Sequence, residues 1–294
     1  MMEHEGRFLS GADAFPAIFG DHPIPAGGGP LARLSLAALE YGAALALDDP
    51  IALSWRLYRY NTLPQSPEWR RRLPDRRAVA AYLGLDRFDG RAALAHDAVG
   101  GHRLSAHQGW LSWDLRREGA APAGGPRWKL YVSPMVEALP EALHRIVALA
   151  PEWPGAASLK VGSDLPGLLR PDKCVLHFTT RDQLDAAAAR LGAELDGMPA
   201  HGVPFSAEVA GSLLSWGVDP PADRPGPRWL GLESWRLWIT NRLAAALLLA
   251  RTAGPGAATP TGFSLGRLLL EGVDPATWAP RDGTGYLEHP PAGH

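Results

Sequence analysis

Three short stretches in the second half of the chain alternate between polar and apolar residues. They are Arg127–Val132, Ser158–Gly162 and Lys173–Phe178, and every second residue in each of them is apolar. A period of two is the pattern of a strand with one buried face, so these stretches predict three strands. Apolar residues at helical spacing predict a helix at 135–150, between the first two strands, and a further helix after residue 180.

Each predicted strand places one lysine on its polar side, namely Lys129, Lys160 or Lys173. These are the only lysines among the 29 Lys and Arg residues of the chain. Because the chain otherwise uses arginine for positive charge, the lysines are candidates for what arginine cannot do. A buried lysine can lose its proton and act as a base. If the three strands are neighbours in one sheet, the ammonium groups converge on a patch that favours a bound anion.

The first half of the chain has a mostly helical pattern. Leucines and tyrosines between residues 31 and 84 recur at the spacing of one helical face, and Pro64, Pro67 and Pro74 divide the segment. The basic run Trp69–Arg72 lies between these prolines and is typical of a solvated face.

A Gly- and Pro-rich loop, Gly119–Pro126, separates the helical pattern from the predicted strands. We therefore expect a mostly helical region at 1–126 and an α/β domain at 127–294 that ends in a Gly/Pro-rich tail. The predicted fold class is α+β, with helices flanking a mixed β-sheet in the C-terminal part.

The composition excludes several classes of protein. Of the 294 residues, 46% are hydrophobic and 20% charged, and the formal net charge of −2 gives no footprint for nucleic acid or an anionic membrane. A single cysteine, Cys174, allows no disulfide framework, and the ten histidines show no spacing typical of a metal triad. The N-terminus lacks the pattern of a signal peptide. We expect a cytoplasmic protein with no metal site and no cofactor.

Short motifs follow one another at defined spacing in the second half of the chain. They are Trp128–Ser133, Leu159–Val161, Arg170–Lys173, Gly202–Phe205, Gly217–Pro220 and Glu233–Trp235. In this order they resemble the phosphoserine/phosphothreonine lyase superfamily. Its members include phosphothreonine lyase effectors, the lyase domains of class III and IV lanthipeptide synthetases, and Hop-type effector-like proteins of class V lanthipeptide and thioamitide pathways.

The resemblance implies a carbon–oxygen lyase that eliminates phosphate from phosphoserine or phosphothreonine of a ribosomal peptide precursor. The products would be dehydroalanine and dehydrobutyrine. In that family a strand lysine removes the α-proton, and by position this residue is Lys160, while Lys129 matches the residue that neutralises the developing enolate or phosphate. Removal of such a weakly acidic proton needs both a positioned base and electrostatic support for the enolate.

The resemblance also implies a set of phosphate ligands. Arg170 and Lys173 match two of them, and either Arg236 or Arg242 matches a later arginine that completes the anion site. Guanidinium forks and lysine charges are the groups that bind a phosphate dianion well.

The chain departs from the lyase effectors and the class III domains at Tyr131, where they have a histidine that serves as general acid. Phosphate has a second pKa of about 6 and can leave as the dianion without a strong acid. Tyr131, or His177 on a neighbouring strand, can still supply a hydrogen bond. Loss of the histidine is equally compatible with a domain that binds a phosphopeptide without cleaving it.

Two other functions stay open. An aromatic or peptide prenyltransferase of the ABBA type also uses Lys-x-Tyr strand motifs, although that fold needs many more strands than the three predicted here. The other is a non-catalytic scaffold with the lyase fold that binds a phosphopeptide or partner protein. In the favoured function the partners are a phosphorylated precursor peptide and a separate kinase-like protein, since the sequence contains no kinase motif.

Overall fold

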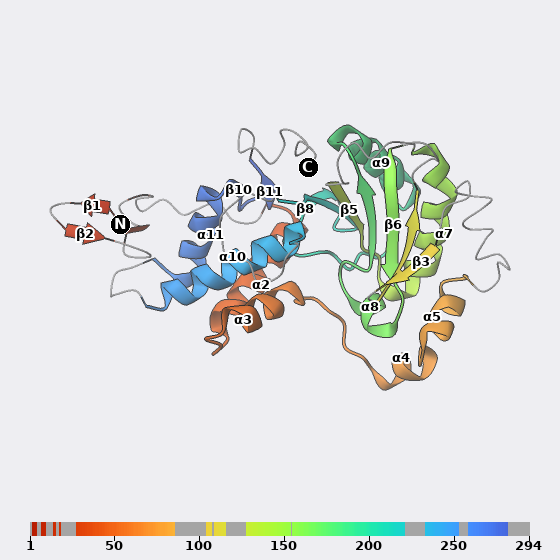
Figure 1. The fold of residues 1–294 in the computed structure, drawn as a ribbon, viewed down its shortest axis with the longest axis horizontal. Helices are drawn as coiled ribbons and strands as arrows, with labels where there is room; N and C mark the ends of the chain where they lie inside the picture. The colour runs from red at the N-terminus through yellow and green to blue at the C-terminus, as the bar shows by residue number, and fades with distance from the viewer. Residues whose placement is uncertain are drawn as a thin grey trace. The chain divides into compact units, whose positions relative to one another are not determined.

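The structure is a computed structural model of the chain, and it divides into two compact units (Figure 1). It describes residues 2–4, 7–9, 14–15, 18, 28–85, 104–107, 109–115, 128–153, 155–220, 233–252 and 258–281. Unit 1 comprises Met1–Tyr60, Pro204–Ala207 and Asp219–His289, and unit 2 comprises Asn61–Val203, Glu208–Val218 and Pro290–His294. Each unit is therefore assembled from segments that are far apart in the sequence.

A seven-stranded sheet forms the centre of unit 2. In spatial order its strands are β3 (Leu104–His107), β4 (Trp110–Asp114), β6 (Ala156–Gly162), β7 (Cys174–Phe178), β5 (Trp128–Val132), β9 (Leu214–Val218) and β8 (Ala207–Ala210). The three strands predicted from alternation are β5, β6 and β7, and they are neighbours in the middle of the sheet. We expected a mixed sheet, but every pair with a defined register among the described residues is antiparallel.

One face of this sheet is covered by apolar packing. Leu159, Leu176 and Leu130 lie opposite one another on β6, β7 and β5, and each is almost fully buried. Helix α9 (Arg181–Glu194) packs against β5 and β7, and α7 (Leu139–Leu149) buries an amphipathic face of its own. Because side chains alternate along a strand, the residues that flank each of these leucines in its strand point to the opposite face.

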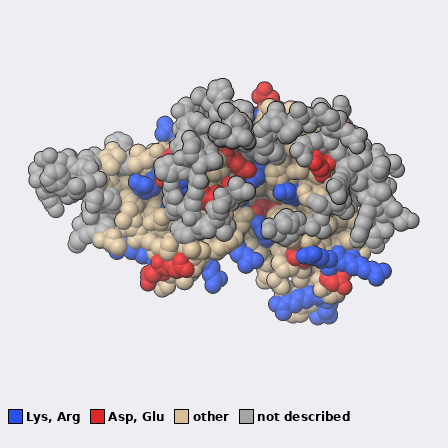
Figure 2. Space-filling model, in the orientation of Figure 1, with Lys and Arg blue, Asp and Glu red and all other residues tan. Residues whose placement is uncertain are grey.

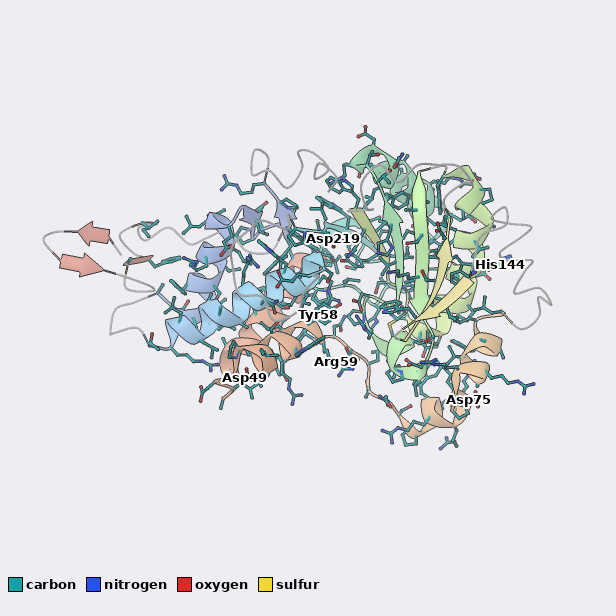
Figure 3. All side chains as sticks on the ribbon, viewed as in Figure 1. Asp49, Tyr58, Arg59, Asp75, His144 and Asp219 are labelled. Atoms are coloured by element: carbon teal, nitrogen blue, oxygen red, sulfur yellow. The ribbon has the colours of Figure 1, made fainter. Side chains whose placement is uncertain are left out.

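Short helices complete unit 2. They are 3-10 helices η2 (Val136–Ala138) and η3 (Ala150–Glu152), and α-helices α4 (Pro67–Arg72), α5 (Arg76–Tyr82) and α8 (Leu165–Leu169). Asp75, labelled in Figure 3, caps α5 by accepting a hydrogen bond from the backbone N–H of Ala78. The Pro-divided helical pattern of the sequence corresponds to α4 and α5 here and to two helices of unit 1.

Unit 1 is built around α10 (Trp235–Ala250), which is buried on nearly all sides. Helices α2 (Pro30–Ala44), α3 (Pro50–Tyr58) and α11 (Pro260–Leu270) pack against it. Two small antiparallel pairs, β1 (Met2–His4) with β2 (Arg7–Leu9) and β10 (Val273–Asp274) with β11 (Ala279–Pro280), accompany them. Within the described ranges, no helix has the length and apolar character needed to cross a membrane.

The α+β class predicted from the sequence is confirmed by this arrangement of helices and sheet. The predicted boundary between 1–126 and 127–294 falls among residues 116–127, which lie outside the described residues. That boundary stays a prediction. Most of the predicted tail, from residue 282 onward, also lies outside them.

Gly162, at the end of β6, makes a close backbone approach to Gly167 in α8. A Cβ atom at Gly162 would meet backbone atoms of Gly167 at 2.5, 2.8 and 2.9 Å. We predict that Gly162→Ala destabilises the protein by about 1–3 kcal/mol, because the added methyl group overpacks backbone that cannot move aside. Urea unfolding would measure this change in the free energy of unfolding.

Gly192 in α9 offers a matched control in the same unit. An added Cβ there would make ordinary contacts with Ala210 and Leu214 at 3.8 and 3.9 Å. Gly192→Ala should stabilise the protein by up to about 1 kcal/mol, since alanine is the better helix former. Equal unfolding free energies for the two variants would show that β6 and α8 are not held in this close approach.

Candidate active site

The register of the three central strands places two of the predicted lysines on one face of the sheet. His177 on β7 lies opposite Lys129 on β5 and opposite Ser158 on β6. In the next row, a single residue of β7 lies opposite both Tyr131 on β5 and Lys160 on β6. Residues directly opposite one another in antiparallel strands share a face, so the structure brings Lys129, Lys160, Tyr131 and His177 together.

Two rows of side chains cross this face from β4 to β9. One row consists of Asp114, Ser158, His177, Lys129 and Gly217, and the other of Ser112, Lys160, Val175, Tyr131 and Ser215. We call this face the lysine face. Lys129 and Lys160 are half-buried, whereas Tyr131 is only 3% exposed and packs with Val175.

The pKa of His177 responds to burial and to both lysines of the lysine face. Burial lowers its pKa well below 6.5, and the positive charges of Lys129 and Lys160 lower it further. Its Nδ1 atom lies 3.1 Å from the Oγ atom of Ser158, within hydrogen-bonding distance. The imidazole is therefore neutral near pH 7. Because both lysines act on the same ring, their ammonium groups lie within electrostatic reach of one another.

Arg170 is held next to this region by its own neighbours. Its Nε and Nη2 atoms donate to the two carboxylate oxygens of Asp172, each at 2.8 Å, and Asp172 is buried. The guanidinium also stacks over the ring of Trp110 at 5.2 Å. Such a two-point ion pair fixes the plane of the guanidinium. The side chain of Arg170 keeps 26% of its surface exposed.

Lys173 differs from the other two lysines because it is fully buried. Its Nζ atom donates to the carbonyl oxygen of Pro134 at 2.9 Å and to Nδ1 of His201 at 2.6 Å. Nε2 of His201 in turn donates to the carbonyl oxygen of Asn61 at 2.6 Å. A carbonyl can only accept, so the proton of this imidazole is on Nε2 and Nδ1 is free to accept from Lys173. The contacts of Lys173 in this structure are thus with the protein itself, and its role as a phosphate ligand stays a prediction.

Arg236, one of the two later arginines predicted to contact phosphate, belongs to unit 1 and makes its contacts there. It is 1% exposed, and it donates to the carbonyl oxygens of Pro204 at 2.9 Å and of Tyr58 at 2.8 Å. Its guanidinium lies over the ring of Tyr58, a residue labelled in Figure 3. These contacts tie three segments of unit 1 together.

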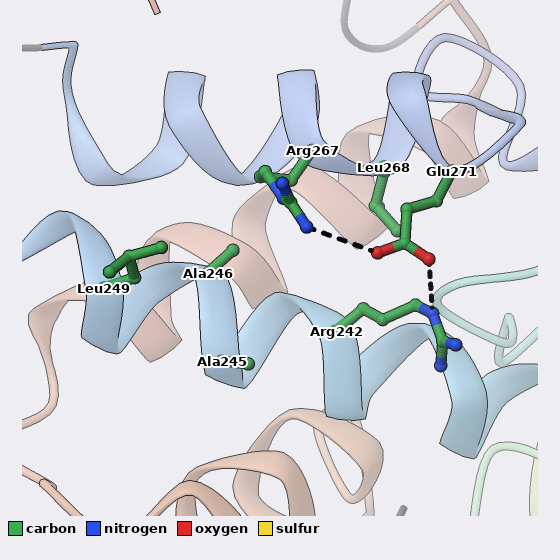
Figure 4. Close-up of a pocket in the computed structure, with 7 residues that line it drawn as sticks. All are labelled: Arg242, Ala245, Ala246, Leu249, Arg267, Leu268 and Glu271. Carbon is green, nitrogen blue, oxygen red and sulfur yellow. Dashed lines mark hydrogen bonds and ion pairs between the residues drawn. The ribbon is translucent and has the colours of Figure 1, made fainter. Parts of the chain in front are cut away.

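Arg242 lines a small pocket of about 90 Å³ between α10 and α11, shown in Figure 4. Its Nε atom donates to Glu271 at 2.7 Å, and Glu271 also pairs with Arg267 at 3.6 Å. The carboxylate of Glu271 therefore offsets the charge of both arginines that line this pocket. As with Arg236, a phosphate-binding role for Arg242 stays a prediction.

The comparisons with known proteins concern the fold. No protein-family model matches the sequence, and no curated protein matches it. Among solved structures, the effector protein from Pseudomonas syringae pv. syringae strain 61 is similar, with a TM-score of 0.50 and 16% identity over 85% of this chain and 98% of that one. The fold of this chain is thus similar to that of this effector protein. An identity of 16% shows a shared fold and not a shared activity.

Two further solved structures are similar at lower TM-scores. The effector protein from P. syringae pv. tomato strain DC3000 has a TM-score of 0.45 and 14% identity, covering 84% of this chain and 97% of that one. The VirA (SpvC) phosphothreonine lyase effector protein of Chromobacterium violaceum has a TM-score of 0.34 and 15% identity, covering 40% and 65%. Phosphothreonine lyase effectors, the family resemblance predicted from the sequence, are thus among the solved structures that this chain matches. A TM-score below 0.5 is too loose to carry a functional argument.

The buried pair of Lys173 and His201 predicts a loss of stability in acid. Burial, followed by the charge of Lys173, lowers the pKa of His201 from 6.5 to about 4. The unfolded chain takes up a proton on this ring near pH 6.5, whereas the folded chain resists it until about pH 4. The contribution of His201 to the free energy of unfolding is therefore complete above pH 6.5, and up to about 3 kcal/mol of it is lost as the pH drops from 6.5 to 4.

His201→Gln should remove this part of the pH dependence, so that the stability difference from wild type shrinks between pH 6.5 and 4. His144→Gln is the control, because His144 is an exposed histidine on α7, labelled in Figure 3. Urea unfolding at several pH values measures both variants. An unchanged difference between wild type and His201→Gln across this pH range would show that His201 is not held neutral by Lys173 and burial.

Proposed function

We propose that this chain is a phosphoserine/phosphothreonine lyase that acts on a ribosomally made peptide precursor. The observation that supports it most is the pairing of Lys129 and Lys160 on one sheet face, on either side of a single imidazole. A proton-abstracting lysine needs a second positive charge beside it to stabilise the enolate that forms.

In the proposed reaction, neutral Lys160 takes the α-proton of the phosphorylated residue. The electron pair of the C–H bond becomes the new double bond between the α- and β-carbons as the bond from the β-carbon to the phosphate oxygen breaks. Phosphate leaves with the electron pair of that carbon–oxygen bond, and no water is added. Lys129 stabilises the enolate, and Arg170 offers its fixed guanidinium to the phosphate.

The alternatives are not equally supported by the fold. An ABBA prenyltransferase needs a closed barrel, whereas the described residues form one linear sheet with β3 and β8 at its ends. A binding scaffold would use the same lysine face to hold a phosphopeptide without chemistry, and the assay below separates it from a lyase. We further propose that a separate kinase-like protein phosphorylates the precursor, because the sequence resembles lyases of lanthipeptide pathways and contains no kinase motif.

Phosphate release from a phosphoserine peptide tests the proposal directly. A lyase produces inorganic phosphate and a peptide that has lost phosphoric acid, whereas a phosphatase would leave serine. Mass spectrometry distinguishes the two products. A wild-type protein that binds the phosphopeptide without releasing phosphate would support the scaffold instead.

Lys160→Arg should lower phosphate release by about 10²–10⁴-fold, the usual contribution of a general base, because arginine stays protonated near pH 7. Binding of the phosphopeptide should persist. Lys129→Arg is the matched change on the same face, and it should cost about tenfold or less if Lys129 acts only through its charge. Retained turnover in Lys160→Arg would mean that Lys160 is a counter-charge and not the base.

Tyr131→Phe should cost about tenfold or less, because the change removes one neutral hydrogen bond of about 1 kcal/mol. His177→Asn should also be tolerated within that range, since a neutral imidazole is not a strong acid. Tyr131→His should be neutral or beneficial in a working lyase. A loss of about 10²–10⁴-fold in Tyr131→Phe would instead assign the role of general acid to Tyr131.

A further inference from the structure

Helices α4 and α5 concentrate positive charge on a small part of the surface of unit 2. Five arginines in eight consecutive positions are exposed, namely Arg70, Arg71, Arg72, Arg76 and Arg77. We call them the arginine patch. Figure 2 shows blue side chains gathered where Figure 1 places these two helices, at the lower right of the view. The formal net charge of the whole chain is −2, so this concentration is local.

Among the described residues, the arginines of the patch form no ion pair, in contrast to four arginines on longer helices. On longer helices, arginines pair with carboxylates one turn away: Arg145 with Glu141, Arg181 with Asp185, Arg190 with Glu194 and Arg267 with Glu271. Within the described part of the chain, no arginine of the patch forms such an ion pair. The nearby carboxylate of Asp75 is used to cap α5.

Packing does not account for the patch either. No residue of α4 is buried, and α5 buries only Val79. Exposed helical positions accept glutamate, glutamine or lysine about as well as arginine. The sequence of α4 and α5 therefore contributes surface charge to the protein more than it contributes to the core.

The centre of the patch is held by contacts with two aromatic rings. The guanidinium of Arg72 lies over the rings of Trp69 and Tyr82, at 5.4 and 4.8 Å, and the two rings meet edge to face. The hydroxyl of Tyr82 donates to the carbonyl oxygen of Val136 at 2.8 Å, which fastens α5 to η2. A preorganised guanidinium loses less conformational entropy on binding than a free one.

These features fit an acidic polypeptide better than a nucleic acid. Arginine forks match the geometry of carboxylates, and clusters of arginine are a recurrent surface for acidic segments. Single-stranded nucleic acid needs aromatic faces on which bases can stack, and Arg72 already covers Trp69 and Tyr82.

We propose that the arginine patch docks an acidic, Asp/Glu-rich segment of a polypeptide partner. The backbone N–H of Leu63, shortly before α4, donates to the carbonyl oxygen of Leu169 at 3.0 Å, one residue before Arg170. The patch is thus tied to the segment that carries a candidate phosphate ligand. This leads to a second statement, which rests on the proposed function. The docked polypeptide is the lyase substrate, and its acidic segment is separate in sequence from the residues that the lyase modifies.

The test for docking measures binding without turnover. The probe is a fluorescein-labelled glutamate peptide of about ten residues, which is long enough to span several arginine forks. Its binding is measured by fluorescence anisotropy at low and at physiological salt. Arg70→Glu/Arg71→Glu should weaken binding by about tenfold or more, since desolvated arginines are frequent centres of binding energy. Arg33→Glu/Arg56→Glu makes the same change in charge at exposed positions of unit 1 and should leave binding within about twofold.

Three results would overturn docking of an acidic polypeptide: unchanged binding in Arg70→Glu/Arg71→Glu, an equal loss in both double variants, or tighter binding of a thymidine oligonucleotide of the same length. Arg70→Gln/Arg71→Gln, checked by circular dichroism, replaces the first variant if that variant does not fold.

For the substrate statement, phosphate release is compared for phosphoserine peptides with and without a glutamate-rich extension. Arg70→Glu/Arg71→Glu should raise KM for the extended peptide only, with kcat unchanged. A wild type that binds the glutamate peptide through the patch but releases no phosphate would refute the lyase function and leave the docking intact.

Discussion

The register of β7 between β6 and β5 decides which side chains can meet on the central sheet of unit 2. With His177 opposite both Lys129 and Ser158, the polar residues of three strands share one face and Leu130, with its neighbours, fills the other. A slip of one residue on either side would move a lysine into the apolar layer against α9. Burial of the leucine face therefore fixes the lysine face, although the leucines make no contact with a substrate.

Charged groups in this protein divide into those that are half-buried and those that are enclosed. Lys173, Arg236 and Arg242 are enclosed, and backbone carbonyls, His201 or Glu271 accept their hydrogen bonds. Removing such a cation from water is costly unless hydrogen-bond acceptors replace the lost hydration, so the folded state depends on these contacts. Lys129 and Lys160 are half-buried, which leaves part of each side chain able to meet a substrate. Burial thus separates the three lysines, which the strand pattern treats alike.

The sequence predicts local features well and long-range ones poorly. Alternation over Arg127–Val132 identifies β5, because a period of two directly reflects one buried face. The order β6-β7-β5 and its antiparallel pairing depend on contacts between distant segments, which no local pattern encodes. The same limit explains Lys173: its acceptors on Pro134 and His201 are 39 and 28 residues away in the sequence. The division into two units, each built from separate segments, was equally invisible to composition.

The position of the imidazole on the lysine face constrains any chemistry there. In the lyase effectors and class III domains that the sequence resembles, a histidine occupies the position of Tyr131, whereas here an imidazole lies one row away on the adjacent strand, at His177. Diagonal neighbours in a sheet are about 7–8 Å apart, within reach of long side chains. Burial and two lysine charges keep His177 uncharged, so it can exchange a hydrogen bond with a substrate but cannot neutralise a leaving phosphate. In the proposed reaction that charge would be met by permanent cations, and Arg170, already fixed by Asp172, lies shortly before β7 in the sequence. A lyase built this way would depend on electrostatic stabilisation of the leaving group more than on its protonation.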